Sequence, residues 1–399
     1  MLIEPKVRGF ICTTAHPEGC KQNVQEQIKY IKEKGAYGAD IFSAKNVLII
    51  GASTGYGLAT RIAATYGGNA STIGVMYEKP ASDRRTATPG WYNTAAFEEF
   101  ATKDGYYATS INGDAFSTEI KEKTIERIKQ DLGQVDLVIY SLAAPRRTDA
   151  NGVTYSSVLK TTDEVFTNKS LDLRNNTVSE ASISPATEEE IIATTKVMGG
   201  EDWFDWMKAL DEAGVLTEGA TTLAYSYIGP TLTYPVYYKG TIGKAKEHLY
   251  QTSQAMNTYF KEKNYHAYIS INKALVTQAS SAIPIVPLYM AILYKVMKEE
   301  NLHEDCIMQM DRLFREKTPL TQPATDTLSR IRLDDYELRD SIQSKVMEYW
   351  EQINTENVTV LADIEGYWSD FYHMFGFHFT NIDYTKDVDP NLNIPSLPL

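Results

Sequence analysis

A tyrosine followed by two lysines is the part of this chain best suited to proton transfer. Tyr237, Lys244 and Lys246 lie within the run Y-Y-K-G-T-I-G-K-A-K. A phenol has an unperturbed pKa near ~10. A nearby ammonium group lowers that pKa by stabilising the phenolate, so the phenol can release a proton near neutral pH. We therefore predict that Tyr237 is a catalytic acid and that a lysine is its partner.

The spacing of these residues leaves the choice of lysine open. On a straight helix the residue at i+7 returns to nearly the face of residue i, whereas the residue at i+9 does not. This geometry favours Lys244, which is seven residues after Tyr237, over Lys246, which is about 2.5 turns away. Tyr237 itself is expected just before a long helix that extends to about Lys263.

A second phenol and a polar segment are expected to face the same crevice. Tyr227 lies at the end of a predicted strand, Thr221–Ile228, where its hydroxyl suits hydrogen bonding to an oxyanion. Leu275–Thr277 follows another predicted strand, Ala267–Ile271. The apolar segment Ser280–Tyr289, which holds two prolines, suits either the wall of an acyl-chain site or ordinary core packing.

A glycine-rich turn, N-V-L-I-I-G-A-S-T-G-Y-G, precedes these residues in the chain and predicts a phosphate cradle. Val47–Ile50 is an unbroken apolar run typical of a buried parallel strand, and helical spacing begins at Leu58. Glycine allows close approach of a pyrophosphate, and the helix N-terminus offers free N–H groups. The spacing G-x-x-x-G-x-G differs from the commonest dinucleotide fingerprint, and a tight turn without a ligand is the alternative.

An acidic residue follows the second predicted strand, Ser71–Tyr77. Glu78 lies 27 residues after Gly51, a little beyond the roughly 20 expected in dinucleotide-binding folds. A carboxylate here accepts hydrogen bonds from ribose hydroxyls and repels a 2′-phosphate, which favours NADH over NADPH. A solvated acid at a strand end is the alternative.

The remaining strand–helix units predict one doubly wound α/β fold. Strands at Tyr106–Ile111 and Val135–Ser141 end in Asp114, Ala115, Leu142 and Ala143, where ligands of such folds bind. We predict a single catalytic domain with a Rossmann-type parallel sheet at residues 46–317. The polar stretch 148–213 is expected to be an insertion, and residues 1–45 an N-terminal extension with a helix at Asn23–Lys34. Residues 318–399 are expected to form a C-terminal extension with one clear helix, Leu338–Gln352, and an aromatic tail.

Composition limits the classes of partner. The 39 Lys and Arg residues against 52 Asp and Glu give a formal charge of −13, which argues against a nucleic-acid or anionic-membrane partner, and no stable membrane insertion is expected. Three scattered cysteines fit a reducing, cytoplasmic compartment, and we expect a monomer. The spacing of Cys12, His16 and Cys20 suggests metal binding, but structural zinc takes four ligands. We predict packing or capping roles for these three residues and no metal.

Eight motifs in order carry a resemblance to a known family. They are V-L-I-I-G-A-S-T-G-Y-G, G-W-Y-N, I-N-G-D-A-F, Y-S-L-A-A-P-R-R, V-M-G-G-E-D-W, A-Y-S-Y-I-G-P, Y-Y-K-G-T-I-G-K-A-K and K-A-L-V-T-Q-A-S-S-A-I-P. The chain resembles the trans-2-enoyl-CoA reductase and FabV-type enoyl-[acyl-carrier-protein] reductase family over essentially its whole length. Members of that family reduce the carbon–carbon double bond of enoyl thioesters with NADH.

The resemblance also implies roles for individual residues. The family's spacing of a tyrosine, eight residues and a lysine falls on Tyr237 and Lys246, and its substrate-contacting tyrosine falls on Tyr227. The extra Lys244 leaves the division of roles between the two lysines open. Contacts to NADH are implied for Gly51, Ala52, Ser53, Thr54, Gly55, Tyr56, Tyr77, Glu78, Asp114, Ala115, Leu142, Ala143, Lys246, Leu275, Val276 and Thr277. Because no second phosphate cradle follows Thr318, we do not predict FAD.

The sequence therefore predicts an NADH-dependent reductase of trans-2-enoyl thioesters, acting in fatty-acid synthesis or in butyrate-type metabolism. The substrate carrier, coenzyme A or acyl carrier protein, is left open, as is chain length. The alternative is a non-catalytic NADH-binding regulator, which would have no need of a proton donor.

Overall fold

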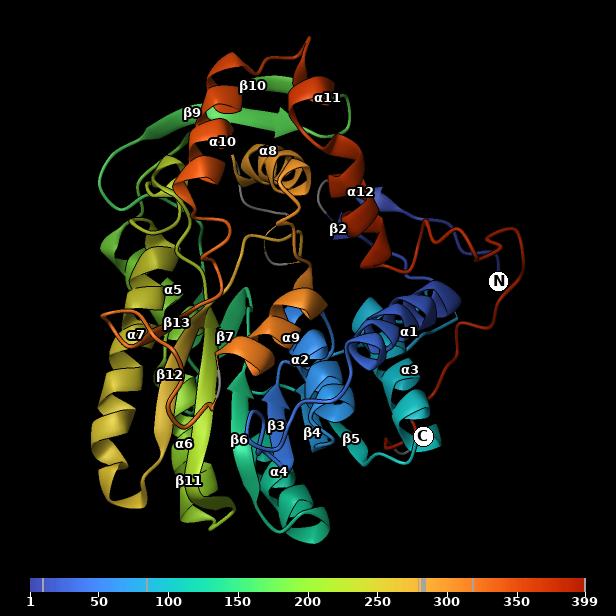
Figure 1. Cartoon of the computed structure of the whole chain (residues 1–399), viewed down its shortest axis with the longest axis vertical. Helices are drawn as coiled ribbons and strands as arrows, with labels where there is room; N and C mark the ends of the chain where they lie inside the picture. The colour runs from blue at the N-terminus through green and yellow to red at the C-terminus, as the bar shows by residue number, and fades with distance from the viewer. Residues whose placement is uncertain (9–10, 84, 279, 281–284, 318, 398–399) are drawn as a thin grey trace.

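A seven-stranded, wholly parallel sheet forms the centre of the molecule (Figure 1). The computed structural model describes residues 1–8, 11–83, 85–278, 280, 285–317 and 319–397. The strand order is β13-β12-β11-β6-β3-β4-β5, so the direction of winding reverses between β3 and β6. The strands are β3 (Asn46–Ile50), β4 (Ser71–Met76), β5 (Ala108–Asn112), β6 (Val135–Tyr140), β11 (Leu216–Ser226), β12 (His266–Ile271) and β13 (Arg330–Arg332).

Helices cover both faces of the sheet, which is why a central strand such as β3 carries apolar residues on both of its sides. Alternate residues of β3 point to opposite sides: Val47 and Ile49 pack in one core, Leu48 and Ile50 in the other. The first core includes α1 (Pro17–Lys34), α2 (Gly55–Ile62), α3 (Pro89–Lys103) and α9 (Cys306–Glu316). The second includes α4 (Thr118–Asp131), α6 (Glu201–Glu212) and α7 (Thr241–Tyr259), with α5 (Glu188–Met198) beside α7.

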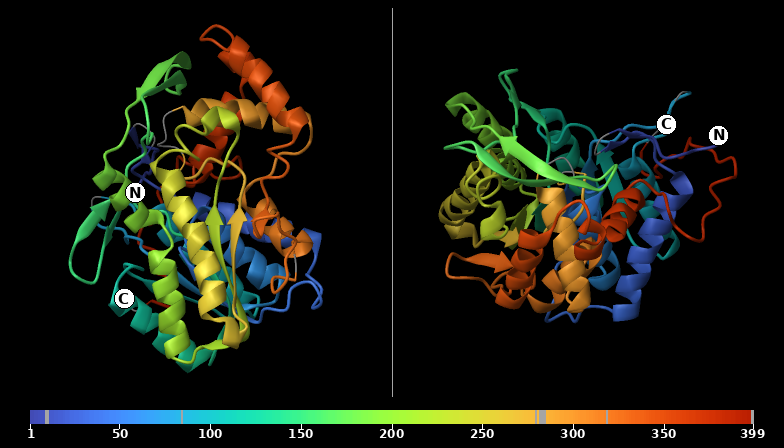
Figure 2. Two further views of the ribbon diagram at one scale, coloured as in Figure 1. Left: turned by 90° about the vertical axis from the view of Figure 1, so that its left-hand side faces the viewer. Right: turned by 90° about the horizontal axis from the view of Figure 1, so that it is seen from above.

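A third group of elements lies beyond the carboxyl ends of the strands (Figures 1 and 2). It has its own apolar core and consists of α8 (Val286–Glu299), α10 (Asp340–Gln352), α11 (Val358–Leu361), α12 (Ile364–His373) and the hairpin β9 (Phe166–Asp172) and β10 (Thr177–Ile183). Lys169 Nζ, on β9, donates to the carbonyls of Trp350, Glu351 and Ile353 at 2.7–3.0 Å. A cation at the C-terminal end of α10 complements the helix dipole, so this lysine links the hairpin to the C-terminal segment.

Shorter elements complete the chain. They are the strand pairs β1 (Val7–Arg8) with β2 (Ile11–Cys12) and β7 (Arg146–Thr148) with β8 (Thr154–Ser156), the π-helical turn Ala63–Gly67 that continues α2, and the 3₁₀ turns Thr231–Thr233 and Lys261–Lys263. None of the helices in the described parts of the chain combines the length and apolarity needed to cross a bilayer.

The predicted doubly wound fold is confirmed, and the six predicted strands lie close to their expected positions. Three expectations about local structure are wrong. The first helix begins at Pro17 rather than Asn23, because His16 caps it by accepting the Gly19 N–H at 3.3 Å. A seventh strand, β13, joins the sheet edge. The aromatic tail contains a further helix, α12, whose apolar face is buried against α8.

Candidate functional site

The glycine turn connects β3 to α2 with almost no space for side chains. Gly51 and Gly55 have positive φ angles of 89° and 51°, which other residues rarely adopt. A Cβ on Gly57 would lie 1.8 Å from the Gly51 carbonyl oxygen. Thr54, the residue before α2, makes no side-chain cap, so the first N–H groups of the helix remain free to bind an anion.

Glu78 lies immediately beyond β4 and contacts this turn. Its Oε1 accepts a hydrogen bond from Ser53 Oγ at 2.6 Å, and its main chain is held by Asn112 through bonds of 2.8 and 3.0 Å. A Cβ on Gly90, in the first turn of α3, would lie 2.1 Å from Glu78 Oε1. Burial raises the pKa of Glu78, while the bond from Ser53 opposes this shift.

Of the other residues expected on the cofactor side, Leu142 and Thr277 lie beside the same turn. Leu142 Cδ2 lies 3.1 Å from the Cβ position of Gly51, and Thr277 Cγ2 lies 3.8 Å from that of Gly55. Asp114 and Ala115 follow β5, where Lys121 Nζ donates to the Ala115 carbonyl at 3.1 Å. Ala143 follows β6 and is exposed, Tyr77 is 73% exposed, and Leu275 and Val276 are buried.

Tyr227 and Tyr237 come together at the end of β11. Their rings meet edge to face, with centroids 4.7 Å apart and planes at 84°. Tyr227 directly follows the strand, whereas Tyr237 lies in the turns before α7, where its N–H donates to the Thr233 carbonyl at 2.9 Å. Both rings are half-buried, and burial raises the pKa of each hydroxyl.

The two candidate lysines point in different directions. Lys246 Nζ donates to the Tyr225 carbonyl on β11 at 3.1 Å, and burial lowers the pKa of this lysine to about 8. Lys244 is 51% exposed and lies 3.6 Å from Glu247. The helical-spacing argument for Lys244 fails because α7 begins only at Thr241, so Tyr237 does not share its periodicity.

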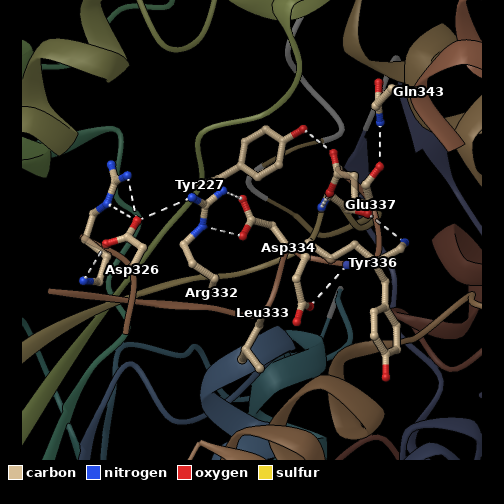
Figure 3. A network of polar contacts seen from close by, with 12 residues as sticks. Tyr227, Asp326, Arg332, Leu333, Asp334, Tyr336, Glu337 and Gln343 are labelled. Atoms are coloured by element: carbon tan, nitrogen blue, oxygen red, sulfur yellow. Dashed lines mark hydrogen bonds and ion pairs between the residues drawn. The ribbon is translucent and has the colours of Figure 1, made fainter. Parts of the chain in front are cut away.

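Glu337 is a site residue that sequence reasoning missed. It lies between β13 and α10, is fully buried, and its Oε1 accepts the Tyr227 hydroxyl at 2.8 Å (Figure 3). The run R-L-D-D-Y-E-L-R-D resembles an exposed acidic turn, so nothing local distinguishes Glu337 from its neighbours. Lys273, just beyond β12, was also missed; it is 2% exposed, and a charged residue at the end of an apolar strand was the available signal.

Two other predictions concern the apolar segment Ser280–Tyr289 and the group formed by Cys12, His16 and Cys20. Within Ser280–Tyr289, positions 281–284 lie outside the described residues, and Val286 begins α8, whose Tyr289 is fully buried. Cys12, Cys20 and His16 are buried, and His16 caps α1, as predicted. Within the described parts of the chain, no group of three His, Cys, Asp or Glu residues is placed to hold a metal ion.

Comparison with known proteins identifies the family. Residues 2–83 match the NAD(P)H binding domain of trans-2-enoyl-CoA reductase, and residues 85–318 match the trans-2-enoyl-CoA reductase catalytic region. The chain is 56% identical over 399 residues to an enoyl-[acyl-carrier-protein] reductase [NADH] of Flavobacterium johnsoniae, with 100% of both chains covered. This chain belongs to the trans-2-enoyl-CoA reductase family.

Further relatives match this member of the trans-2-enoyl-CoA reductase family over 97% or more of its length. A trans-2-enoyl-CoA reductase [NADH] of Ruminiclostridium cellulolyticum is 51% identical, with 100% of both chains covered. The crystal structure of Clostridium acetobutulicum trans-2-enoyl-CoA reductase in complex with NADH is 44% identical, covers 100% of both chains and has a TM-score of 0.94. The Treponema denticola enzyme in complex with NAD is 46% identical, with 97% and 98% coverage and a TM-score of 0.92.

Residues 325–388 of this family member match a model described as an enoyl reductase FAD binding domain. Stretch 325–365 contains no glycine. At the start of α12, Asp363 accepts the Gly366 N–H at 2.9 Å and lies 2.6 Å from Lys298 Nζ, so a carboxylate occupies the place where a pyrophosphate would bind. These residues do not fit a flavin dinucleotide, and we assign no flavin chemistry to them.

Proposed function

We propose that this chain reduces the carbon–carbon double bond of trans-2-enoyl thioesters with NADH. The observation that carries the proposal is the contact between Tyr227 and Tyr237 at the carboxyl end of β11, with Lys246 Nζ on the carbonyl of neighbouring Tyr225. This cluster lies at the same sheet edge as the glycine turn, where ligands of doubly wound folds bind.

The cofactor side is assigned from the contacts around the glycine turn. The free N–H groups at the start of α2 suit the pyrophosphate, and Glu78 suits the ribose hydroxyls because its carboxylate lies beside Ser53. The same carboxylate repels a 2′-phosphate and so favours NADH. Leu142 and Thr277, which flank the turn, are expected to contact the cofactor further along its length.

The substrate side is assigned from the two phenols. NADH, when bound, supplies the hydride that the β-carbon of the enoyl thioester accepts. Tyr227 and Tyr237 donate hydrogen bonds to the thioester oxygen, on which negative charge develops, and Tyr237 supplies the proton. Lys246 stabilises the phenolate that Tyr237 becomes, because an ammonium group lowers the free energy of a nearby anion.

The experiment that tests this function is NADH oxidation, followed by absorbance, with crotonyl-CoA and then with crotonyl-acyl carrier protein. We expect turnover with at least one of them. A clear preference for crotonyl-CoA would assign the carrier as coenzyme A, and the opposite preference would assign acyl carrier protein. Tight NADH binding without oxidation would support a non-catalytic regulator instead.

The monomeric state and the cytoplasmic location stay predictions. Light scattering coupled to gel filtration tests the first, and cell fractionation tests the second. A dimer in solution, or recovery with the membrane fraction, would contradict the respective prediction.

A further inference from the structure

Glu337 brings the C-terminal segment into direct contact with the substrate side of the site. Its side chain is 0% exposed, and its two carboxyl oxygens receive three hydrogen bonds. Oε1 accepts the hydroxyls of Tyr227 at 2.8 Å and Tyr289 at 2.7 Å, and Oε2 accepts the N–H of Ala274 at 2.7 Å. Figure 3 shows the Tyr227 hydroxyl pointing at this carboxyl group.

The direction of the bond between Tyr227 and Glu337 matters because a phenol has one proton. An ionised carboxylate can only accept hydrogen bonds, so the Tyr227 O–H points at it and is not available to a thioester oxygen. A protonated carboxyl group can reverse this bond by donating to the Tyr227 oxygen, which frees the Tyr227 proton for the substrate. The same network therefore allows or blocks hydrogen bonding to substrate, depending on one proton.

The bond from Tyr289 is not reversed so easily. Gln343 Nε2 donates to the Tyr289 oxygen at 3.3 Å and to the Glu337 carbonyl at 2.7 Å. The Tyr289 hydroxyl thus receives one hydrogen bond and directs its own proton to Glu337 Oε1. Of the two phenols on this oxygen, Tyr227 is the one whose proton is available to turn.

The surroundings of Glu337 favour its neutral form. Burial is the larger effect and raises its pKa; Lys273, which is 2% exposed and donates to the Ala274 carbonyl at 3.0 Å, opposes the shift. The titratable and charged groups that face this carboxyl group are Tyr56 on α2, Tyr227 after β11, Tyr237 before α7, Lys273 after β12 and Tyr289 on α8. Negative charge on a thioester oxygen beside Tyr227 would further disfavour a carboxylate there.

We propose that Glu337 is a positioning residue that acts as a neutral carboxylic acid, donating its O–H to Tyr227 so that Tyr227 donates to the thioester oxygen. The proposal rests on the proposed function. Glu337 keeps its proton throughout. Only the hydroxyl groups rotate, and no covalent bond is made or broken at Glu337 or Tyr227. It also gives the C-terminal segment a role in catalysis that needs no flavin.

The discriminating variant is Glu337→Gln. Its amide oxygen can accept the Ala274 N–H, and its NH₂ group can donate to Tyr227 as the neutral acid does. Because an amide nitrogen accepts no hydrogen bond, the Tyr289 hydroxyl must turn its own proton away from this group and accept from it instead. We expect the kcat of this variant to stay close to wild type at acidic pH. Its loss of activity at alkaline pH should move upward, to the titration of Lys246 at about 8.

A matched control is Asp334→Asn. Asp334 is also fully buried and belongs to the same segment, but its carboxylate pairs with Arg332 at 2.7 Å and does not contact Tyr227. We expect its pH profile to match wild type. The Tyr227→Phe variant removes the hydroxyl that Glu337 orients, so it should lower kcat. Its activity should fall at alkaline pH over the same range as that of Glu337→Gln. The double variant should show no further change in this alkaline limb of the pH profile.

The pH dependence of kcat with crotonyl-CoA, together with NADH affinity from fluorescence titration, decides the outcome. An unchanged alkaline limb in Glu337→Gln, or a kcat lower at every pH by about 100-fold, the loss typical of a missing oxyanion donor, would overturn the proposal. Should Glu337→Gln not fold, an unchanged limb in Tyr227→Phe would overturn it equally. A wild-type protein that reduces neither crotonyl thioester would instead overturn the proposed function.

Discussion

The proposed cofactor side and the proposed substrate side of the site are held together by different kinds of contact. On the cofactor side, one short stretch of main chain between Gly51 and Gly57 forms the turn, and Glu78 lies only 21 residues beyond it. On the substrate side, Tyr227 contacts the ring of Tyr237 and donates a hydrogen bond to Glu337, which is 110 residues further along the chain. Steric limits on the backbone shape the first side, whereas ring packing and hydrogen bonds between residues distant in sequence hold the second.

This difference predicts that substitutions on the two sides impair the enzyme in different ways. A substitution on the cofactor side should weaken NADH binding by filling space or changing charge, while the chemistry of bound substrate remains. A substitution on the substrate side should lower kcat at nearly constant NADH affinity, because interactions made in the transition state are lost. The following four experiments test that contrast.

The largest effect is expected for Tyr237→Phe. Removing a general acid lowers kcat by about 100- to 10,000-fold, and the hydroxyl does not belong to the glycine turn proposed to bind the pyrophosphate. NADH oxidation with crotonyl-CoA measures kcat, and fluorescence titration should give an unchanged Kd for NADH. Tyr238→Phe, at an exposed neighbour, is the control. If Tyr237→Phe keeps most of its activity with normal NADH affinity, the assignment is wrong.

Lys246→Ala should cost about 100-fold in kcat, the loss typical of one preorganised charged or hydrogen-bonding group. Lys244→Ala should stay near wild type, because Lys244 is 51% exposed and an exposed ion pair contributes little. The two variants carry the same chemical change two residues apart, so equal losses would contradict the separation of roles that their orientations suggest.

Gly57→Ala tests the cofactor side. The added Cβ would lie 1.8 Å from the Gly51 oxygen, and relieving such overpacking costs about 1–3 kcal/mol. If that cost appears in NADH binding, Kd rises by about 10- to 100-fold. Gly133→Ala is the control: its φ of 76° strains an alanine, but nothing lies within 4 Å of its Cβ position. It should lower the melting temperature and leave the Kd for NADH unchanged.

The smallest effect is expected for Glu78→Ala. Loss of the ribose acceptor and of the repulsion toward a 2′-phosphate should reduce the preference for NADH over NADPH by about tenfold, or ~1.4 kcal/mol. Glu78→Gln keeps a hydrogen-bond acceptor but removes the charge, so it should affect NADPH more than NADH. The ratio of kcat/KM for the two cofactors is the measurement, and an unchanged ratio in both variants would refute the ribose role.

The local pattern was sufficient for most of the fold. Apolar runs such as Val47–Ile50 specify buried strands, and the glycines after them specify a tight turn, because both features depend on residues adjacent in sequence. The edge strand β13 was missed because R-I-R has a single apolar residue and pairs only with β12. Helix α12 was missed because, apart from the cap made by Asp363, it gains its stability from the packing of its aromatic residues on α8.

The sequence by itself determined the apolar strands of the doubly wound sheet, the glycine turn and the spacing of Tyr237 and the two lysines, since each of these depends on a short run of residues. Only the tertiary structure separates the two lysines in space, because the start of α7 at Thr241 sets which of them faces β11. It alone also placed Glu337 against Tyr227. An acidic residue in a polar run gives no sign of burial, and the distant elements that enclose it become neighbours only when the chain folds.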